Sequence, residues 1–470
     1  MTQPNIILII TDNQPADLLG CYGNDEIHTP HIDALAARGA RFMQAYCPNA
    51  MCSPCRASIL TGHMPSQHGV HTWLDDRLAG TWPAGWNAVE GLPTFTQALK
   101  DAGYRTGLVG KYHLGLPQPG QNGIDHWAVM EAGHTTRFEG IPMRVNGEPV
   151  DCPGHSVDFF TEEALKFIAA GPEPYALILA YNGPYGHWPS IAGRADNRFA
   201  HLYDHTMMQR VPREGICPEA IALYDLQKHL SGPGGPDFSG VLKLPNNLES
   251  LRNYYSQMSL VDDGVGRVVA AAGDAVIAFT ADHGFSLGHH GYWGHGQATW
   301  PSSINRISYS VPLILAGPGI SPSVPAGLAS NMDLGPTLLD LAGVVPFDSA
   351  ARSLAGMLAG APSPHGALFF EQEESRALRT EDWLCVSRFE GSATYPLGHA
   401  LYDLRADPDC RVNLTGLRDE EARLASELSA AFEEMAHPAY DLWRGGACKS
   451  NTSRPWLWRD VWGDGWAPVL

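Results

Sequence analysis

Basic residues are scarce in this 470-residue sequence, and so are long apolar runs. The chain contains 31 Lys and Arg against 50 Asp and Glu, which gives a formal net charge of −19. Nucleic-acid-binding proteins need a basic surface to displace counterions, so this balance argues against that class. If the substrate is an anion, its binding site must be locally basic within an acidic protein.

No stretch approaches the roughly 18 consecutive apolar residues of a membrane-spanning helix, so no membrane partner is expected. The first ten residues, MTQPNIILII, lack the basic segment of a secretory signal, and their apolar run is too short for one. We therefore expect a cytoplasmic protein, or a periplasmic one if a leader has been removed. The nine cysteines are odd in number and scattered, which does not fit a disulfide framework in a chain of this size.

Apolar runs alternate with helical patterns along much of the chain. The run NIILII, residues 5–10, is typical of a strand buried on both faces. Segment 248–273 carries the longest helical pattern. Further strands are expected at 104–113, 175–184, 275–280 and 311–317, and further helices at 31–39 and 332–343. This alternation predicts an α/β fold whose parallel sheet is covered by helices on both faces.

A change in composition near residues 360–366 divides the chain. We assign residues 1–362 to a main domain, in which 190–245 lose periodicity and are expected to form a long insertion over the site. Residues 363–440 fit a smaller domain of short antiparallel strands and an amphipathic helix. The C-terminal tail, residues 441–470, has four Trp among its last 17 residues. We expect this tail to pack on the chain's own body or on a second subunit, which would make a homo-oligomer.

Polar side chains follow four of the expected strands, at the point where each strand ends. They are Asp12 and Asn13, Lys111 and His113, His187, and Asp282 and His283. In parallel sheets, ligands bind beyond the carboxyl ends of the strands. The sequence therefore predicts that these side chains lie along one rim and form the site.

The segment NAMCSPCRASILTG, residues 49–62, places two cysteines three positions apart. A thioredoxin-type redox site would put such a pair at the start of a helix in a small βαβ domain. A zinc site would need a second close cysteine pair or paired histidines, and the sequence has no second Cys-x-x-Cys. Two buried cysteines without chemistry are a further interpretation, so the motif alone leaves these alternatives open.

Taken as a whole, this segment resembles the signature of the sulfatase family, in the alkaline-phosphatase-like superfamily. The match has the core Cys-x-Pro-x-Arg, from Cys52 to Arg56, and continues through Gly62. Other segments resemble further motifs of the family in the same order: NIILIITDNQ, CYGN with HTPHIDALAARGARF, GKYHLG, FTADHG and LYDLRADPDCRVNL. The resemblance implies a large mixed, mostly parallel sheet sandwiched by helices, with a smaller C-terminal α/β domain that contains an antiparallel sheet.

The resemblance also implies a chemistry for Cys52. A formylglycine-generating enzyme would oxidise this residue to formylglycine, and Cys55 would be only a variable position. One hydroxyl of the hydrated aldehyde would attack the sulfur of a sulfate ester. The other hydroxyl would then lose its proton, so that the aldehyde reforms and sulfate leaves.

A divalent cation completes the implied site. Its ligands would be Asp12, Asn13, Asp282, His283 and the oxygen at position 52. Asn13 and His283 depart from the commonest family pattern, which has Asp and Asn at these places. Calcium is the first expectation, and manganese and magnesium stay open because of these two departures.

Four side chains take further roles by the same resemblance. Arg56, one helical turn after Cys52 if a helix starts there, would orient the hydrate and neutralise charge. Lys111 would bind a sulfate oxygen. His113 would point to the same side in an extended chain and bond the nucleophile's second hydroxyl. His187 would donate a proton to the leaving oxygen.

The loop LGHHGYWGHGQ has a histidine, His295, where the family usually has lysine. His295 can still contact sulfate, but its charge would depend on pH, so activity would fall more steeply as pH rises. His290 in the same loop is a second candidate. Trp73 and the 190–245 insertion are expected to line the substrate pocket.

The function that we expect is hydrolysis of a small-molecule or carbohydrate sulfate ester. The nearest alternative is a phosphonate monoester or phosphodiester hydrolase on the same scaffold. A Cys-x-x-Cys metal or redox module would instead need both thiols. An unconverted relative that only binds anions is the last alternative.

Overall fold

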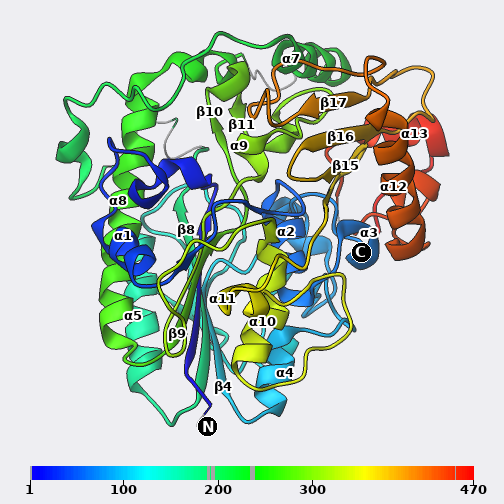
Figure 1. The fold of residues 1–470 in the computed structure, drawn as a ribbon. Helices are drawn as coiled ribbons and strands as arrows, with labels where there is room; N and C mark the ends of the chain where they lie inside the picture. Colours follow the sequence, from blue (N-terminus) through cyan, green and yellow to red (C-terminus); the bar gives the residue numbers. More distant parts are fainter. Residues whose placement is uncertain (1–2, 188–190, 192–195, 233–238, 450, 470) are drawn as a thin grey trace.

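The computed structural model describes residues 3–187, 191, 196–232, 239–449 and 451–469. Within these residues the main sheet has nine strands, in the order β2-β12-β9-β1-β8-β4-β5-β6-β7 (Figure 1). They are β1 (Ile6–Asp12), β2 (Ala40–Arg41), β4 (Arg105–Gly110), β5 (His126–Met130), β6 (Met143–Val145), β7 (Glu148–Val150), β8 (Tyr175–Pro184), β9 (Val276–Ala281) and β12 (Leu313–Ala316).

The centre of this sheet is parallel and its edges are antiparallel. β1 pairs in parallel with β8 and β9, and β4 pairs in parallel with β8 and β5. β12 runs antiparallel to β9 and β2, and β6 runs antiparallel to β5 and β7. The mixed α/β sheet that the sequence predicts is thus confirmed.

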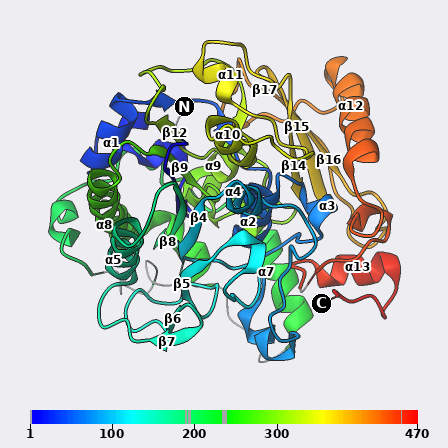
Figure 2. The same ribbon diagram turned by 90° about the horizontal axis from the view of Figure 1, so that it is seen from below.

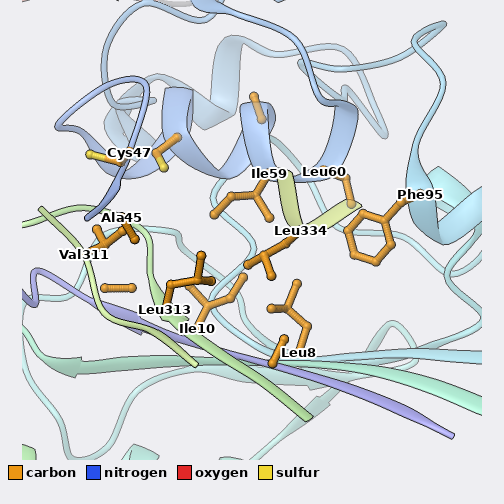
Figure 3. Packing of buried hydrophobic residues seen from close by; sticks show 14 of the residues in the cluster. Leu8, Ile10, Ala45, Cys47, Ile59, Leu60, Phe95, Val311, Leu313 and Leu334 are labelled. Carbon is orange, nitrogen blue, oxygen red and sulfur yellow. The ribbon is translucent and has the colours of Figure 1, made fainter. Parts of the chain in front are cut away.

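Alternate residues of β1 enter two separate hydrophobic cores. Ile7 and Ile9 belong to the core beneath α1 (Pro30–Ala37), α5 (Ser156–Ala169) and α8 (Leu248–Ala271). Leu8 and Ile10 belong to the opposite core, beneath α2 (Cys52–Thr61), α4 (Phe95–Asp101) and α10 (Leu334–Leu341). Figures 1 and 2 show these two sets of helices on opposite sides of the sheet, and Figure 3 shows the second core. A strand buried on both faces must be apolar throughout, which explains the run NIILII.

A second, antiparallel sheet follows toward the C-terminus. Its strands are β14 (Leu368–Gln372), β15 (Ser375–Arg379), β16 (Trp383–Arg388) and β17 (Ala400–Asp403). The helix α12 (Glu420–Met435) covers this sheet, with Leu424 and Leu428 packed on Leu378 and Leu401. The smaller antiparallel sheet that the sequence predicts toward the C-terminus is thus confirmed.

The C-terminal tail packs on the chain's own body. It forms α13 (Pro455–Trp462), and the side chains of Leu457 and Trp458 are completely buried. They contact Phe389, at the end of β16, and Leu442. Packing on the chain's own body thus accounts for Trp458, whereas Trp462 is 38% exposed.

The region 190–245 contains a helix that its sequence pattern does not predict. α7 (Pro218–Ser231) buries only Ala220 and Leu223, so its apolar periodicity is weak. Residues 190, 192–195 and 233–238 of this region lie outside the described residues. No helix in the described part of the chain is long and apolar enough to cross a membrane.

Shorter elements connect the two sheets to the helices. They are β3 (Ala45–Tyr46), β10 (Ser286–Leu287), β11 (Trp293–Gly294), β13 (Ala329–Ser330), α3 (Pro65–His68), α9 (Arg306–Tyr309) and α11 (Ala355–Leu358).

Gly110 allows two central strands to lie close together at their carboxyl ends. It is the last residue of β4 and has a positive φ of 114°. A Cβ atom at this position would lie 1.9 Å from the carbonyl oxygen of Ala180 in β8. The same oxygen accepts a hydrogen bond from the backbone N–H of Lys111 at 2.7 Å. Glycine is therefore required for the backbone that presents Lys111.

We predict that Gly110→Ala strongly destabilises the fold. The clash costs about 1–3 kcal/mol, and the positive φ adds about 1–2 kcal/mol for a residue with a Cβ atom. Gly120→Ala is the matched control, because Gly120 also has a positive φ but open space around its Cβ position. Thermal unfolding followed by circular dichroism should show a clearly larger loss for Gly110→Ala. Equal losses in the two variants would show that the contact with Ala180 is unimportant.

Candidate active site

The carboxyl ends of β1, β4 and β9 meet at one edge of the main sheet, facing the start of α2. Asp12 is the last residue of β1, Lys111 follows β4 and Asp282 follows β9. The Nζ atom of Lys111 lies 2.7 Å from Oδ2 of Asp12, and Sγ of Cys52 lies 3.7 Å from Oδ1 of Asp12. Parallel strands thus bring together residues that are far apart in the sequence.

Cys52 is the first residue of α2. Met51 before it has an extended backbone (φ −147°, ψ 147°), and Gly62 ends the helix with φ 69°. Pro54 falls in the first turn, where a missing backbone N–H breaks no helical hydrogen bond. The motif Cys-x-Pro-x-Arg therefore starts a helix and places Arg56 one turn after Cys52, on the same face.

The guanidinium of Arg56 joins two buried carboxyl groups. Its Nη2 lies 2.9 Å from Oδ2 of Asp12 and 2.8 Å from Oδ2 of Asp282, and its Nη1 donates to the backbone oxygen of Lys111 at 2.8 Å. Both carboxyl groups are fully buried, and Arg56 is 5% exposed. Burial alone would raise the pKa of Asp12, but Lys111 and Arg56 hold it well below its usual range.

Lys111 stays charged although its side chain is fully buried. Burial would lower its pKa, but the carboxylate of Asp12 outweighs this effect and raises the pKa above its usual value. The ammonium also lies 5.1 Å from the ring centroid of Tyr185, at cation–π distance. The site therefore contains two permanent cations, Arg56 and Lys111.

The thiol of Cys52 is held in its neutral form. Burial, followed by the charge of Asp12, raises its pKa far above the usual value for cysteine. Its Sγ lies 3.3 Å from Nε2 of His283, whereas Cys55 donates instead to the backbone oxygen of Asp282 at 2.5 Å. All nine cysteines are free. The two cysteines of the motif thus have different partners, which does not support a redox pair.

Four residues of this edge offer ligand atoms for a cation: Asp12, Cys52, Asp282 and His283 have such atoms within 4.8 Å of one another. The Nδ1 atom of His283 donates to the carbonyl of Gly284 at 2.7 Å. This bond assigns the proton to Nδ1 and leaves a lone pair on Nε2, the atom that faces Cys52.

Asn13 supplies the observation that best fits a cation. Its backbone is left-handed, with φ 60°, and its N–H lies 3.3 Å from Oδ1 of Asp282. The side chain is completely buried, and neither Oδ1 nor Nδ2 has a hydrogen-bond partner among the described residues. A buried amide left unpaired is costly, and a cation bound by Oδ1 would remove part of that cost. Two carboxylates, an amide and an imidazole fit a divalent cation such as calcium, manganese or magnesium.

The backbone at His113 is not extended, contrary to the expectation that placed its side chain on the same side as that of Lys111. β4 ends at Gly110, and His113 has a left-handed backbone with φ 55°, so the alternation of side chains along a strand does not apply. Its Nε2 donates to the carbonyl of Leu74 at 2.9 Å, and its Nδ1 is buried with no partner among the described residues. The reason given for its orientation was wrong, and its bond to the nucleophile stays a prediction.

His187 and His295 lie next to each other, with ring centroids 4.9 Å apart. Burial and then the neighbouring His134 lower the pKa of His187 to about 3. Burial and His187 likewise lower the pKa of His295 well below its usual value. His295 is therefore neutral near pH 7, and the expected cation that loses charge as pH rises is not supported. Bound sulfate would raise both pKa values, because a nearby negative charge favours the protonated form.

A cavity of about 730 Å³ opens beside Cys52, His187 and His295. Trp73 lines it, and so do parts of the 190–245 region, including Ile216 and Leu223. Both features agree with the sequence analysis. The second candidate, His290, instead lines a different cavity with Glu214 and Arg411, so it was a wrong choice.

Other residues near the site were not expected from the sequence. The hydroxyl of Tyr185 lies 3.2 Å from Nδ1 of His134. Tyr185 directly follows β8, so the rule that selected His187 would have found it. No motif marks His134, nor residues 451–454, which also line the cavity.

The sulfatase family model matches residues 4–344, a range that holds all the side chains of this cluster. The chain belongs to the sulfatase family. It is accordingly a sulfuric ester hydrolase. The motif that begins at Cys52 is thus a sulfatase signature rather than a redox or zinc Cys-x-x-Cys.

Similar proteins span nearly the whole sulfatase chain. N-acetylglucosamine-6-O-sulfatase of Bacteroides thetaiotaomicron is 25% identical, over 92% of this chain and 86% of the relative. Choline-sulfatase of Rhizobium meliloti is 27% identical, over 97% of this chain and 90% of the relative. A structure solved in complex with its substrate, D-glucosamine-2-N,6-O-disulfate, has a TM-score of 0.70 at 22% identity. The superposition covers 92% of this chain and 98% of the chain in that structure, which shows that the two proteins share a fold.

Replacement of Asn13 by Asp tests the cation site. Asp also tolerates a left-handed backbone, but a third carboxylate near Asp12 and Asp282 adds repulsion. We expect a lower melting temperature than wild type in EDTA, and a larger rise than wild type on addition of calcium. Differential scanning fluorimetry measures both values. Asn122→Asp, at another left-handed Asn (φ 53°), should show the wild-type response to calcium; an unchanged response in Asn13→Asp would contradict the assignment.

Proposed function

We propose that this sulfatase uses formylglycine, generated from Cys52, together with a divalent cation to hydrolyse the sulfate ester of a small molecule or a carbohydrate. The position of the Cys52 thiol carries the proposal. It is buried beside Asp12 and His283 and one helical turn before Arg56. A thiol kept protonated is a poor nucleophile and a poor metal ligand. An oxygen at the same place would stand where the charged groups of the site converge.

Formylglycine and the cation would supply the nucleophile and additional positive charge. Hydrated formylglycine would offer a hydroxyl as nucleophile toward sulfur, and a cation held by Asp12, Asn13, Asp282 and His283 would supply charge beside it. Calcium suits the oxygen donors, and the imidazole keeps manganese and magnesium as alternatives. A formylglycine-generating enzyme is the partner that this maturation requires.

Side chains of the chain itself meet the remaining needs of the reaction. Lys111 and Arg56 are buried cations that would offset the negative oxygens of the sulfate. His187, at the edge of the cavity, would donate a proton to the leaving oxygen once the bound ester has raised its pKa. His295 would donate a hydrogen bond to sulfate. His113 would bond the second hydroxyl of the nucleophile through its Nδ1, which has no partner in the described part of the chain.

The named activities of the relatives support a sulfate ester as the substrate. One acts on N-acetylglucosamine 6-O-sulfate groups and another on choline sulfate, as their names state. These names leave both a sugar and a small alcohol open as the leaving group.

Oxidation of Cys52 is tested by mass spectrometry of the tryptic peptide that spans residues 42–56, from protein made together with a formylglycine-generating enzyme. We expect an aldehyde in place of the thiol at position 52 and unmodified thiols at Cys47 and Cys55. Cys52→Ala should abolish turnover of 4-nitrophenyl sulfate. Cys55→Ser should keep most of it, because a hydroxyl can also donate to the backbone oxygen of Asp282. An active enzyme with an intact thiol at position 52 would refute the proposal.

Kinetics on matched esters test the choice of sulfate. We expect kcat/KM for an aryl sulfate to exceed that for the corresponding aryl phosphonate monoester and aryl phosphodiester by orders of magnitude. All three esters are monoanions, but the sulfate presents three non-bridging oxygens to the cations of the site, whereas the phosphorus esters present two and carry an additional substituent that the site must accommodate. A preference for the phosphonate of similar size would favour the alternative hydrolase.

A further inference from the structure

The cavity beside Cys52 has one wall that the family motifs do not supply. Residues 451–454 of the C-terminal tail line it, and they lie outside the range 4–344 that matches the family model. We propose that residues 451–454 form the wall that receives the leaving alcohol and favour leaving groups with an apolar or aromatic body and no second anionic group. This inference rests on the proposed hydrolysis of sulfate esters and adds the class of ester to it.

Glu373 anchors this wall to the antiparallel sheet. It lies in the turn between β14 and β15, is 1% exposed and has a positive φ of 42°. Its carboxyl group accepts hydrogen bonds from Oγ1 of Thr452 at 2.5 Å, from the N–H of Ser453 at 2.8 Å and from Nε1 of Trp458 at 3.0 Å. A buried carboxyl group is tolerated only when such donors surround it, so the tail and the turn fix each other.

The wall also joins two loops of the site. The Oδ1 atom of Asn451 accepts a hydrogen bond from the N–H of Asp75 at 3.2 Å, two residues beyond Trp73. On the other side, Nη2 of Arg454 donates to the backbone oxygens of Gln297 at 3.2 Å and Thr299 at 2.8 Å. The second loop carries His295. The tail therefore holds the two loops at a fixed separation across the cavity.

A single side chain closes the connection between these loops. The Nε2 atom of Gln297 donates to Oγ1 of Thr72 at 2.8 Å and to Oε1 of Glu373 at 3.2 Å. Gln297 is 7% exposed and itself lines the cavity. Loop, tail and turn thus form one hydrogen-bonded frame around the opening.

Another part of the lining is apolar. The 190–245 region contributes these described lining residues: Ile216, Ala220, Leu223, Val241, Leu242 and Pro245. Trp73 adds an aromatic surface. Apolar and aromatic surfaces of this kind favour the ring or alkyl group of a leaving alcohol.

The described lining offers few cations for a second sulfate group. Arg77 pairs with Asp75 at 2.6 Å, and its side chain is 82% exposed. Arg454 is 1% exposed and is occupied by the backbone oxygens of the 297–299 loop. Asp75 and Asp76 would moreover repel a second anion. These charges favour an ester that carries a single sulfate.

Replacement of Asn451 by a larger and by a smaller residue tests whether residues 451–454 contact the leaving group. We expect Asn451→Trp to raise KM for the bicyclic 4-methylumbelliferyl sulfate at least about tenfold more than KM for 4-nitrophenyl sulfate. Asn451→Ala should change this ratio in the opposite direction. The ratio of the two kcat values should stay close to that of wild type, because the wall does not touch the sulfur. Asp464→Ala, at an exposed position of the tail, is the control and should behave as wild type.

The outcomes separate this inference from the proposed function. If neither ester is hydrolysed by the formylglycine-containing wild type, the proposed function fails. If wild type is active but both variants shift the two esters equally, only the wall is refuted. A comparison of N-acetyl-D-glucosamine 6-O-sulfate with D-glucosamine-2-N,6-O-disulfate tests the charge of the leaving group, because both esters release a sugar hydroxyl. We expect kcat/KM to be at least about tenfold higher for the monosulfate, and a preference for the disulfate would overturn the inference.

Discussion

One arginine holds the ends of two strands and the start of a helix together. Asp12 and Asp282 are completely buried, and a buried carboxylate without a partner destabilises the folded state by several kcal/mol. Arg56 pairs with both carboxylates at once, because Nη2 of its planar guanidinium lies 2.9 Å from Oδ2 of Asp12 and 2.8 Å from Oδ2 of Asp282. Since Arg56 is one turn after Cys52 in α2, the pairing also sets where Cys52 lies. The spacing of the Cys-x-Pro-x-Arg motif is therefore a structural requirement of the site.

The charges of the site explain how an acidic protein can receive an anion. Within the cluster, Arg56 and Lys111 balance Asp12 and Asp282, so the four side chains together are close to neutral. A divalent cation on the same carboxylates would leave the cluster positive, and the substrate's charge would then offset it. The ligand atoms that this cation would use include Oδ1 of Asn13, which has no partner among the described residues, and Nε2 of His283, which faces Cys52. The net charge of −19 over the whole chain does not decide the local field.

Strand ends were predictable from the sequence, whereas local backbone and burial were not. NIILII had to be a doubly buried strand, and the parallel sheet then brought Asp12, Lys111 and Asp282 to one edge. The argument for the orientation of His113 failed because the alternation of side chains ends with the strand at Gly110. The lowered pKa of His295 could not be foreseen because no sequence pattern shows that His187 and other rings surround it. α7 was missed because a helix that lies over a pocket buries few residues and has little periodicity.

The wall at residues 451–454 could not be predicted from the sequence for a different reason. Its position depends on buried carboxyl groups and their donors rather than on a pattern of apolar residues. Glu371, Glu373 and Glu374 are all nearly completely buried near the β14–β15 turn. Arg376 forms an ion pair with Glu371, and the C-terminal tail donates hydrogen bonds to Glu373. The backbone N–H of Ser302 donates to Glu374 at 2.8 Å. Each carboxyl group would lose a hydrogen-bond donor if its partner segment were displaced, so the turn favours one arrangement of the tail and of the loop after His295. The cavity is thus complete only when the C-terminal tail is packed on the β14–β15 turn, although the catalytic motifs all lie in the first two thirds of the chain.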